Sequence, residues 1–87
     1  MQTHEIVNLI VQKFGGNRIE FTLVKQEIVW FVLGHNEYRC HWSSINSMMI
    51  VWKLNDDTWV MDNYSRWVQG ILNNLVRNDA GEMVPRC

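Results

Sequence analysis

One stretch decides the fold: Ile28-Val29-Trp30-Phe31-Val32-Leu33-Gly34-His35-Asn36-Glu37-Tyr38-Arg39-Cys40-His41-Trp42. Its first six residues are β-branched, aromatic or aliphatic, as is typical of a strand, and a short polar segment follows them. Glycine and asparagine in that segment tolerate the positive φ of a tight turn. The stretch therefore predicts a β-hairpin whose loop is His35 and Asn36.

This loop sets which side chains share a face, because side chains alternate along a strand. Three pairs then face one another on one side of the sheet: Leu33 with Tyr38, Phe31 with Cys40, and Val29 with Trp42. The other side carries Ile28, Trp30 and Val32 opposite Arg39 and His41. The first strand is apolar on both sides, so it needs cover on both, from its own chain or from another molecule.

A strand over residues 18–24 precedes the hairpin, and the connection 25–27 has two possible lengths. A two-residue loop sets Leu23 opposite Ile28, whereas a three-residue loop sets Leu23 opposite Val29 and Phe21 opposite Phe31. We predict the three-residue loop, because it gives one continuous apolar face. That core face consists of Ile19, Phe21, Leu23, Val29, Phe31, Leu33, Tyr38, Cys40 and Trp42. The second face consists of Glu20, Thr22, Val24, Ile28, Trp30, Val32, Arg39 and His41.

Helices are expected at both ends of the chain. The first has Thr3 as N-cap, apolar residues at helical spacing, and Gly15-Gly16 at its end. The second has Asp62 as N-cap. Its apolar face is Tyr64, Trp67, Val68, Ile71, Leu72, Leu75 and Val76, and its polar face is Arg66, Gln69, Asn73, Asn74 and Arg77.

Between the hairpin and the second helix, residues 48–54 and 58–61 predict two further strands across an Asn-Asp-Asp turn. The sequence thus predicts one α+β domain over residues 1–77, followed by an irregular C-terminal tail over 78–87. Its two layers are an antiparallel meander of four to five strands and the two helices. Both helices are expected on the core face. Helices on both faces are the alternative, and would leave no face open.

Composition excludes several classes of function. The 87 residues include 8 basic and 9 acidic side chains, for a net charge of -1, so the basic footprint of nucleic-acid-binding proteins is missing. Cys40 and Cys87 make no disulfide framework. No apolar run in the sequence is long enough to span a bilayer, and the expected location is the cytoplasm.

Residues that could support catalysis or bind a metal do not form a convincing set. His35-Asn36-Glu37 matches half of a zinc-deaminase signature, but the Pro-Cys-x-x-Cys half is missing. Cys40 and His41 are adjacent, so in a strand they point to opposite faces and cannot share a metal or act as a nucleophile and base. Turn formation and helix capping account for the aspartates at positions 56, 57 and 62. We therefore predict a protein that is not an enzyme and has no catalytic, cofactor-binding or metal-binding residues.

The tryptophan content indicates a binding surface. Five tryptophans in 87 residues exceed what so small a core needs, and tryptophan and arginine are the residues most enriched at interface hot spots. Trp42, Trp67, and either Trp52 or Trp59 are assigned to the core, and Trp30 to a contact surface. The predicted partner-binding residues are Ile28, Trp30, Val32, Arg39 and His41.

The predicted function is that of a small non-enzymatic protein-binding module, which docks its aromatic sheet face on a larger protein partner. By analogy with small accessory proteins of bacteriophages and mobile elements, docking would inhibit a host defence or nucleic-acid-handling complex. A homodimer formed through the same face is one alternative. Single-stranded nucleic-acid binding is another, since Trp30, Arg39 and His41 would give a stacking platform, but Glu20 on the same face disfavours it.

Overall fold

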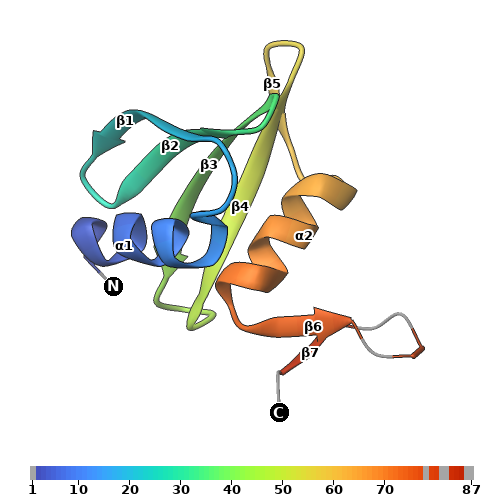
Figure 1. Ribbon diagram of the computed structural model, residues 1–87. Helices are drawn as coiled ribbons and strands as arrows, with labels where there is room; N and C mark the ends of the chain where they lie inside the picture. The colour runs from blue at the N-terminus through green and yellow to red at the C-terminus, as the bar shows by residue number, and fades with distance from the viewer. Residues whose placement is uncertain (1, 78, 81–82, 86–87) are drawn as a thin grey trace.

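The computed structural model describes residues 2–77, 79–80 and 83–85. Five strands, β1 to β5, form one antiparallel sheet in sequence order, and two helices pack against it (Figure 1). The predicted α+β architecture, an antiparallel meander between two helices, is thereby confirmed. The elements are α1 (Thr3–Phe14), β1 (Ile19–Lys25), β2 (Ile28–Leu33), β3 (Asn36–Ser43), β4 (Met48–Asn55), β5 (Thr58–Val60), α2 (Asn63–Leu72), β6 (Leu75–Arg77) and β7 (Met83–Pro85).

Both helices lie on the same face of the sheet, as Figure 1 shows. Their buried residues meet every second residue of the three central strands, and along β2 buried and half-buried residues alternate strictly. The core therefore lies between one sheet face and two helices. It consists of Ile6, Ile10, Phe14, Val29, Phe31, Leu33, Tyr38, Cys40, Met49, Val51, Val68 and Leu72.

The β2–β3 turn is formed by Gly34 and the following histidine, one residue earlier than predicted. Leu33 pairs with Asn36, and Phe31 pairs with Tyr38. Gly34 has φ +65°, which glycine adopts without steric cost, so it takes the first position of the two-residue loop. The predicted pairing was wrong by two residues. Because two residues is the side-chain period of a strand, the same side chains still share the core face.

The β1–β2 connection has features of both predicted loops, the two-residue and the three-residue one. Phe21 pairs with Phe31 as predicted, but the loop has only two residues, with φ +56° at Gln26. A β-bulge between Phe21 and Leu23 takes up the extra residue, so Leu23 pairs with Trp30 instead of Val29. The prediction of Leu23 on the core face was therefore wrong, and its side chain is 50% exposed.

Of the two predicted N-caps, the one at the second helix is confirmed and the one at the first is wrong by one residue. α1 has Gln2 rather than Thr3 at its N-cap, and the Gln2 N–H donates to the Glu5 carboxylate over 3.1 Å. α2 has the predicted N-cap, since Asp62 Oδ1 accepts from the Ser65 N–H over 3.0 Å.

α2 ends at Leu72, five residues before the predicted end at Arg77. Asn74 adopts φ +58°, a left-handed conformation that stops an α-helix. The chain then enters β6, which pairs antiparallel with β7. Residues 83–85, which were predicted to be irregular, are thus a short strand, whereas Cys87 lies outside the described residues.

Two amide side chains of α2 close the edge of β4 where β5 does not reach. Gln69 Oε1 accepts from the Val51 N–H at 3.0 Å, and Asn73 Oδ1 accepts from the Met49 N–H at 2.7 Å. The Asn73 amide also donates to the Met49 carbonyl at 3.0 Å. Gln69 and Asn73 were predicted on the solvent-facing side of the helix. They instead replace a neighbouring strand along a sheet edge that would otherwise expose backbone groups.

This amide clamp predicts a stability effect. Asn73→Ala removes the partners of two backbone groups of Met49, a core residue, so we expect the free energy of unfolding to fall by about 1–3 kcal/mol. Urea denaturation measures the change. Gln12→Ala on the exposed surface of α1 is the control, with an expected change within about 0.5 kcal/mol. Equal losses in the two variants would contradict the clamp.

Candidate functional site

The five predicted partner-binding residues lie together on the sheet face opposite the helices, which we name the outer face. In the strand pairing, Trp30 lies beside Arg39, and Ile28 lies beside His41. Val32 lies beside Glu37 at the other end of the same strand pair. The side chains of all five predicted residues are half-buried.

The β-bulge changes which residues of β1 lie on this face. The bulge in β1 brings Leu23 to the outer face beside Trp30 and turns Val24 to the helix side, where it pairs with Val29. Glu20 remains on the outer face, beside Val32. Sequence reasoning missed the bulge because no residue in β1 marks its position.

The outer face continues over β4 and β5, which the sequence analysis did not include. Arg39 pairs with Trp52, and His41 pairs with Ile50. Trp59 of β5 pairs with Leu54 of β4. Trp52 and Trp59 thus lie outside the core, and the assignment of one of them to it was wrong. Because side chains alternate along a strand, Trp52 was expected to share a face with Ile50 and Leu54. Which face of the sheet this is became clear only from the β3–β4 register.

A stack of rings and a guanidinium forms the centre of the outer face. The Arg39 guanidinium carbon lies 5.0 Å from the ring centroid of Trp52 and 4.9 Å from that of Trp59. The His41 ring stacks on Trp52 with centroids 5.2 Å apart and an interplanar angle of 11°. Among the residues that the structure describes, the buried Arg39 Nε has no hydrogen-bond partner, and the contacts of the guanidinium with the two rings are cation–π contacts. The result is an ordered cationic and aromatic centre in a mainly apolar face.

The remaining two tryptophans lie on the helix side of the sheet. Trp42 packs against the core as predicted. Trp67 was predicted in the core, but its side chain is 51% exposed, and its ring packs edge-on against Phe14 with centroids 5.8 Å apart. Trp67 lies at the margin because α2 turns its central line of residues, including Val68 and Leu72, toward the sheet.

Cys40 and Asp62, whose pKa values are shifted, lie at structural positions, in the core and at the N-cap of α2. Cys40 is fully buried in the core, and burial raises the pKa of its thiol to about 12. His41 lies on the opposite face, as predicted. The backbone hydrogen bond from Ser65 lowers the pKa of Asp62, and Lys53 Nζ, at 3.6 Å, adds to this effect. Within the described residues no three His, Cys, Asp or Glu side chains gather where they could hold a metal.

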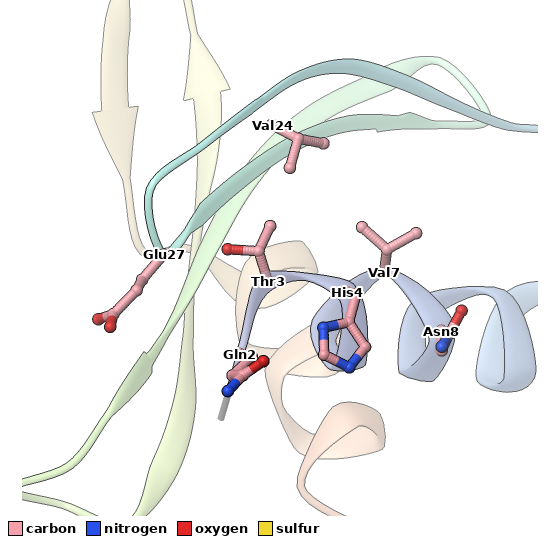
Figure 2. A pocket seen from close by; sticks show the side chains of 7 residues that line it. All are labelled: Gln2, Thr3, His4, Val7, Asn8, Val24 and Glu27. Carbon is pink, nitrogen blue, oxygen red and sulfur yellow. The ribbon is translucent and has the colours of Figure 1, made fainter.

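Two grooves adjoin the turn between β1 and β2. One, of about 320 Å³, opens beside the outer face and is lined by Gln26, Glu27, Ile28 and His41. The other, of about 620 Å³, lies on the helix side between α1 and the end of the hairpin, and Figure 2 shows its lining side chains. Glu27 lines both grooves, so it stands between them.

Comparison with known proteins adds no assignment. No protein-family model, no curated protein and no solved structure matches the chain. In the part of the chain that the structure describes, neither helix has the length and apolar character needed to cross a membrane.

The two faces of β2 predict unequal effects of neighbouring substitutions. Phe31 is fully buried, so we expect Phe31→Ala to reduce the free energy of unfolding by about 3–5 kcal/mol. Trp30 is only half-buried, so Trp30→Ala is expected to cost about 1–2 kcal/mol, below the range for full burial, and to leave a folded protein. Urea denaturation followed by circular dichroism compares the two. Equal losses would mean that the outer face is packed as tightly as the core.

The raised pKa of Cys40 predicts low thiol reactivity and a pH effect. In a Cys87→Ser background, we expect native protein at pH 8 to resist a thiol-directed disulfide reagent, because the thiol is buried and protonated. Since the pKa rises from 9.0 to about 12 on folding, the unfolded state loses this proton first. Stability should fall between pH 9 and 12 by up to about 1.4 kcal/mol per unit from this group.

Cys40→Ala in the same background is the control for the pH effect, because it lacks the thiol but keeps every other titrating group. An identical decline in stability above pH 9 in both proteins would contradict the assignment to Cys40. Rapid labelling of native protein at pH 8 would contradict the burial.

Proposed function

We propose that this protein is a non-enzymatic binding module that docks its outer face on a larger protein. The observation that carries the proposal is the one-sided arrangement of the helices. Strand β2 has apolar side chains on both faces, and its core side is fully covered. On its other side, Ile28, Trp30 and Val32 are only half-buried, and neither helix covers them. Contiguous apolar surface that the protein's own elements leave uncovered is a feature of interaction sites.

The size of the outer face fits a protein partner. Five strands about 4.8 Å apart, with a mean length of about six residues at about 3.3 Å per residue, give a plan area of about 480 Å². Side-chain relief increases the accessible area, toward the roughly 800 Å² that each partner contributes to a standard interface. The groove beside Ile28 and His41 adds a hollow into which a partner side chain can insert.

The chemistry of the outer face also supports docking. Tryptophan and arginine dominate interface hot spots, and here the Arg39 guanidinium already contacts the rings of Trp52 and Trp59 before any partner arrives. A group that is already ordered loses less conformational entropy on binding. The partner expected from this arrangement has an apolar surface with a carboxylate positioned to accept from the exposed part of the guanidinium.

Single-stranded nucleic acid fits this face less well. Stacking of bases needs free ring faces, whereas Trp52 already contacts both Arg39 and His41. Glu20 and Glu37 lie on the same face, and the net charge is -1.

Occupation of the face by a second copy of the chain is the other outcome that the experiment below separates. Cytoplasmic location, where thiols such as Cys40 stay reduced, and inhibition of the partner complex are further parts of the proposal.

Site-specific photo-crosslinking tests the proposal. A photoreactive phenylalanine analogue replaces Val32 on the outer face or, as control, Tyr64, which is 60% exposed on α2. In the cells that encode the protein, we expect one discrete heavier adduct from position 32 and none from position 64. A charge introduced by Ile28→Lys should abolish the adduct, because it cannot be buried against an apolar partner.

Purified protein supplies the second readout. An adduct of twice the chain mass, together with a dimer by light scattering that Trp30→Ala converts to a folded monomer, would assign the outer face to self-association. Absence of any adduct from position 32, or equal adducts from positions 32 and 64, would contradict docking through this face.

A further inference from the structure

The two edges of the sheet differ in whether their outward backbone groups have hydrogen-bond partners. The edge at β4 is closed by β5 along one half and by the side chains of Gln69 and Asn73 along the other. Among the described residues, β1 pairs with β2 alone. Alternate N–H and C=O groups of an edge strand point away from its neighbour, so β1 can accept a further strand.

A groove of about 620 Å³ lies directly beside this edge (Figure 2). Its apolar lining comes from Val7 of α1 and Val24 of β1, whose side chains approach each other across the groove. Val24 pairs with the fully buried Val29, yet its own side chain is 46% exposed. The bulge turns Val24 to the helix side at a point where α1 does not cover it. An apolar side chain entering from outside would complete this packing.

The polar lining defines the remaining chemistry of the groove. Gln2 and Asn8 offer amide groups from the first two turns of α1, and Glu27 supplies a carboxylate at the hairpin turn. The Thr3 hydroxyl donates to the Gln26 carbonyl, which fixes the start of the helix to this turn. Lys25 lies beside Ile28 in the register and therefore on the outer face, away from the groove. His4 also lines the groove, and Glu27 is the only Asp, Glu, Lys or Arg among the lining residues, so the part of the groove beside Glu27 favours a cationic side chain.

We infer that this groove binds an extended peptide segment that adds to the edge of β1. The segment forms main-chain hydrogen bonds to β1, places one apolar side chain between Val7 and Val24, and directs a lysine or arginine to Glu27. Addition of a strand at a sheet edge, with side chains alternately entering a pocket, is an established mode of peptide recognition. The site lies across the β1–β2 turn from the outer face. It shares Glu27 with the groove beside the outer face, so Val24→Lys is the variant that separates it from the proposed docking.

A random heptapeptide library displayed on phage tests the inference. Panning on wild-type protein should enrich an apolar residue with a nearby lysine or arginine. The enriched peptide is then synthesised, and its Kd is measured by titration calorimetry. We expect Val24→Lys and Glu27→Lys each to weaken binding at least tenfold, because the first removes the apolar contact and the second reverses the charge. Gln12→Lys on the exposed surface of α1, outside the groove lining, is the matched control and should leave Kd within twofold.

N-methylation of the peptide identifies strand addition. Methylating alternate amides removes the donors on one side of an extended peptide, so one alternate set should abolish binding and the other should not. The inference is overturned if no sequence is enriched, if the peptide binds Val24→Lys as tightly as wild type, or if the two methylated sets behave alike. Circular dichroism confirms that Val24→Lys is folded, which its exposed position favours. Crosslinking from position 32 is a separate measurement, so either site can fail without the other.

Discussion

A strand with apolar side chains on both faces needs cover on both, and the structure of this protein depends on how that need is met. β2 occupies the interior of the sheet, and both helices pack against one of its faces. Burial of that face supplies the hydrophobic stabilisation of the core. In the described part of the chain neither helix covers the other face, where neighbouring side chains such as Arg39 and Trp52 shield β2. The stable fold and the candidate interface thus have one cause.

The two edges of the sheet also differ, since the edge at β4 is closed and the edge at β1 is exposed. Along β4, two amide side chains one helical turn apart reach backbone groups two residues apart in a strand. This match of a helix period to a strand period closes the edge without a further strand. Along β1, the bulge instead exposes Leu23 on one face and Val24 on the other. One edge is therefore protected, and the other offers both backbone and apolar groups.

Local pattern predicted much of this arrangement. The alternation in residues 28–42 identified the two faces correctly although the turn was misplaced, because an error of two residues leaves every side chain on its own face. The bulge was different, since a shift of one residue moves a side chain to the opposite face. Leu23 and Val24 therefore exchanged their predicted places. Trp67 was misplaced for another reason. Helical periodicity gives the direction of the apolar face of a helix, but not how many residues at its margin are buried.

The sequence by itself determined the class of each main element, the order of the meander, and the five residues that share the outer face, because these follow from side-chain period and turn chemistry within short segments. Tertiary structure alone decided that both helices cover the same face, that Trp52 and Trp59 both contact Arg39, and that α2 stops where Asn73 binds β4. Each of these joins residues far apart in the chain or in separate elements. Local preferences are silent on such contacts, because their energy is gained only when the elements meet.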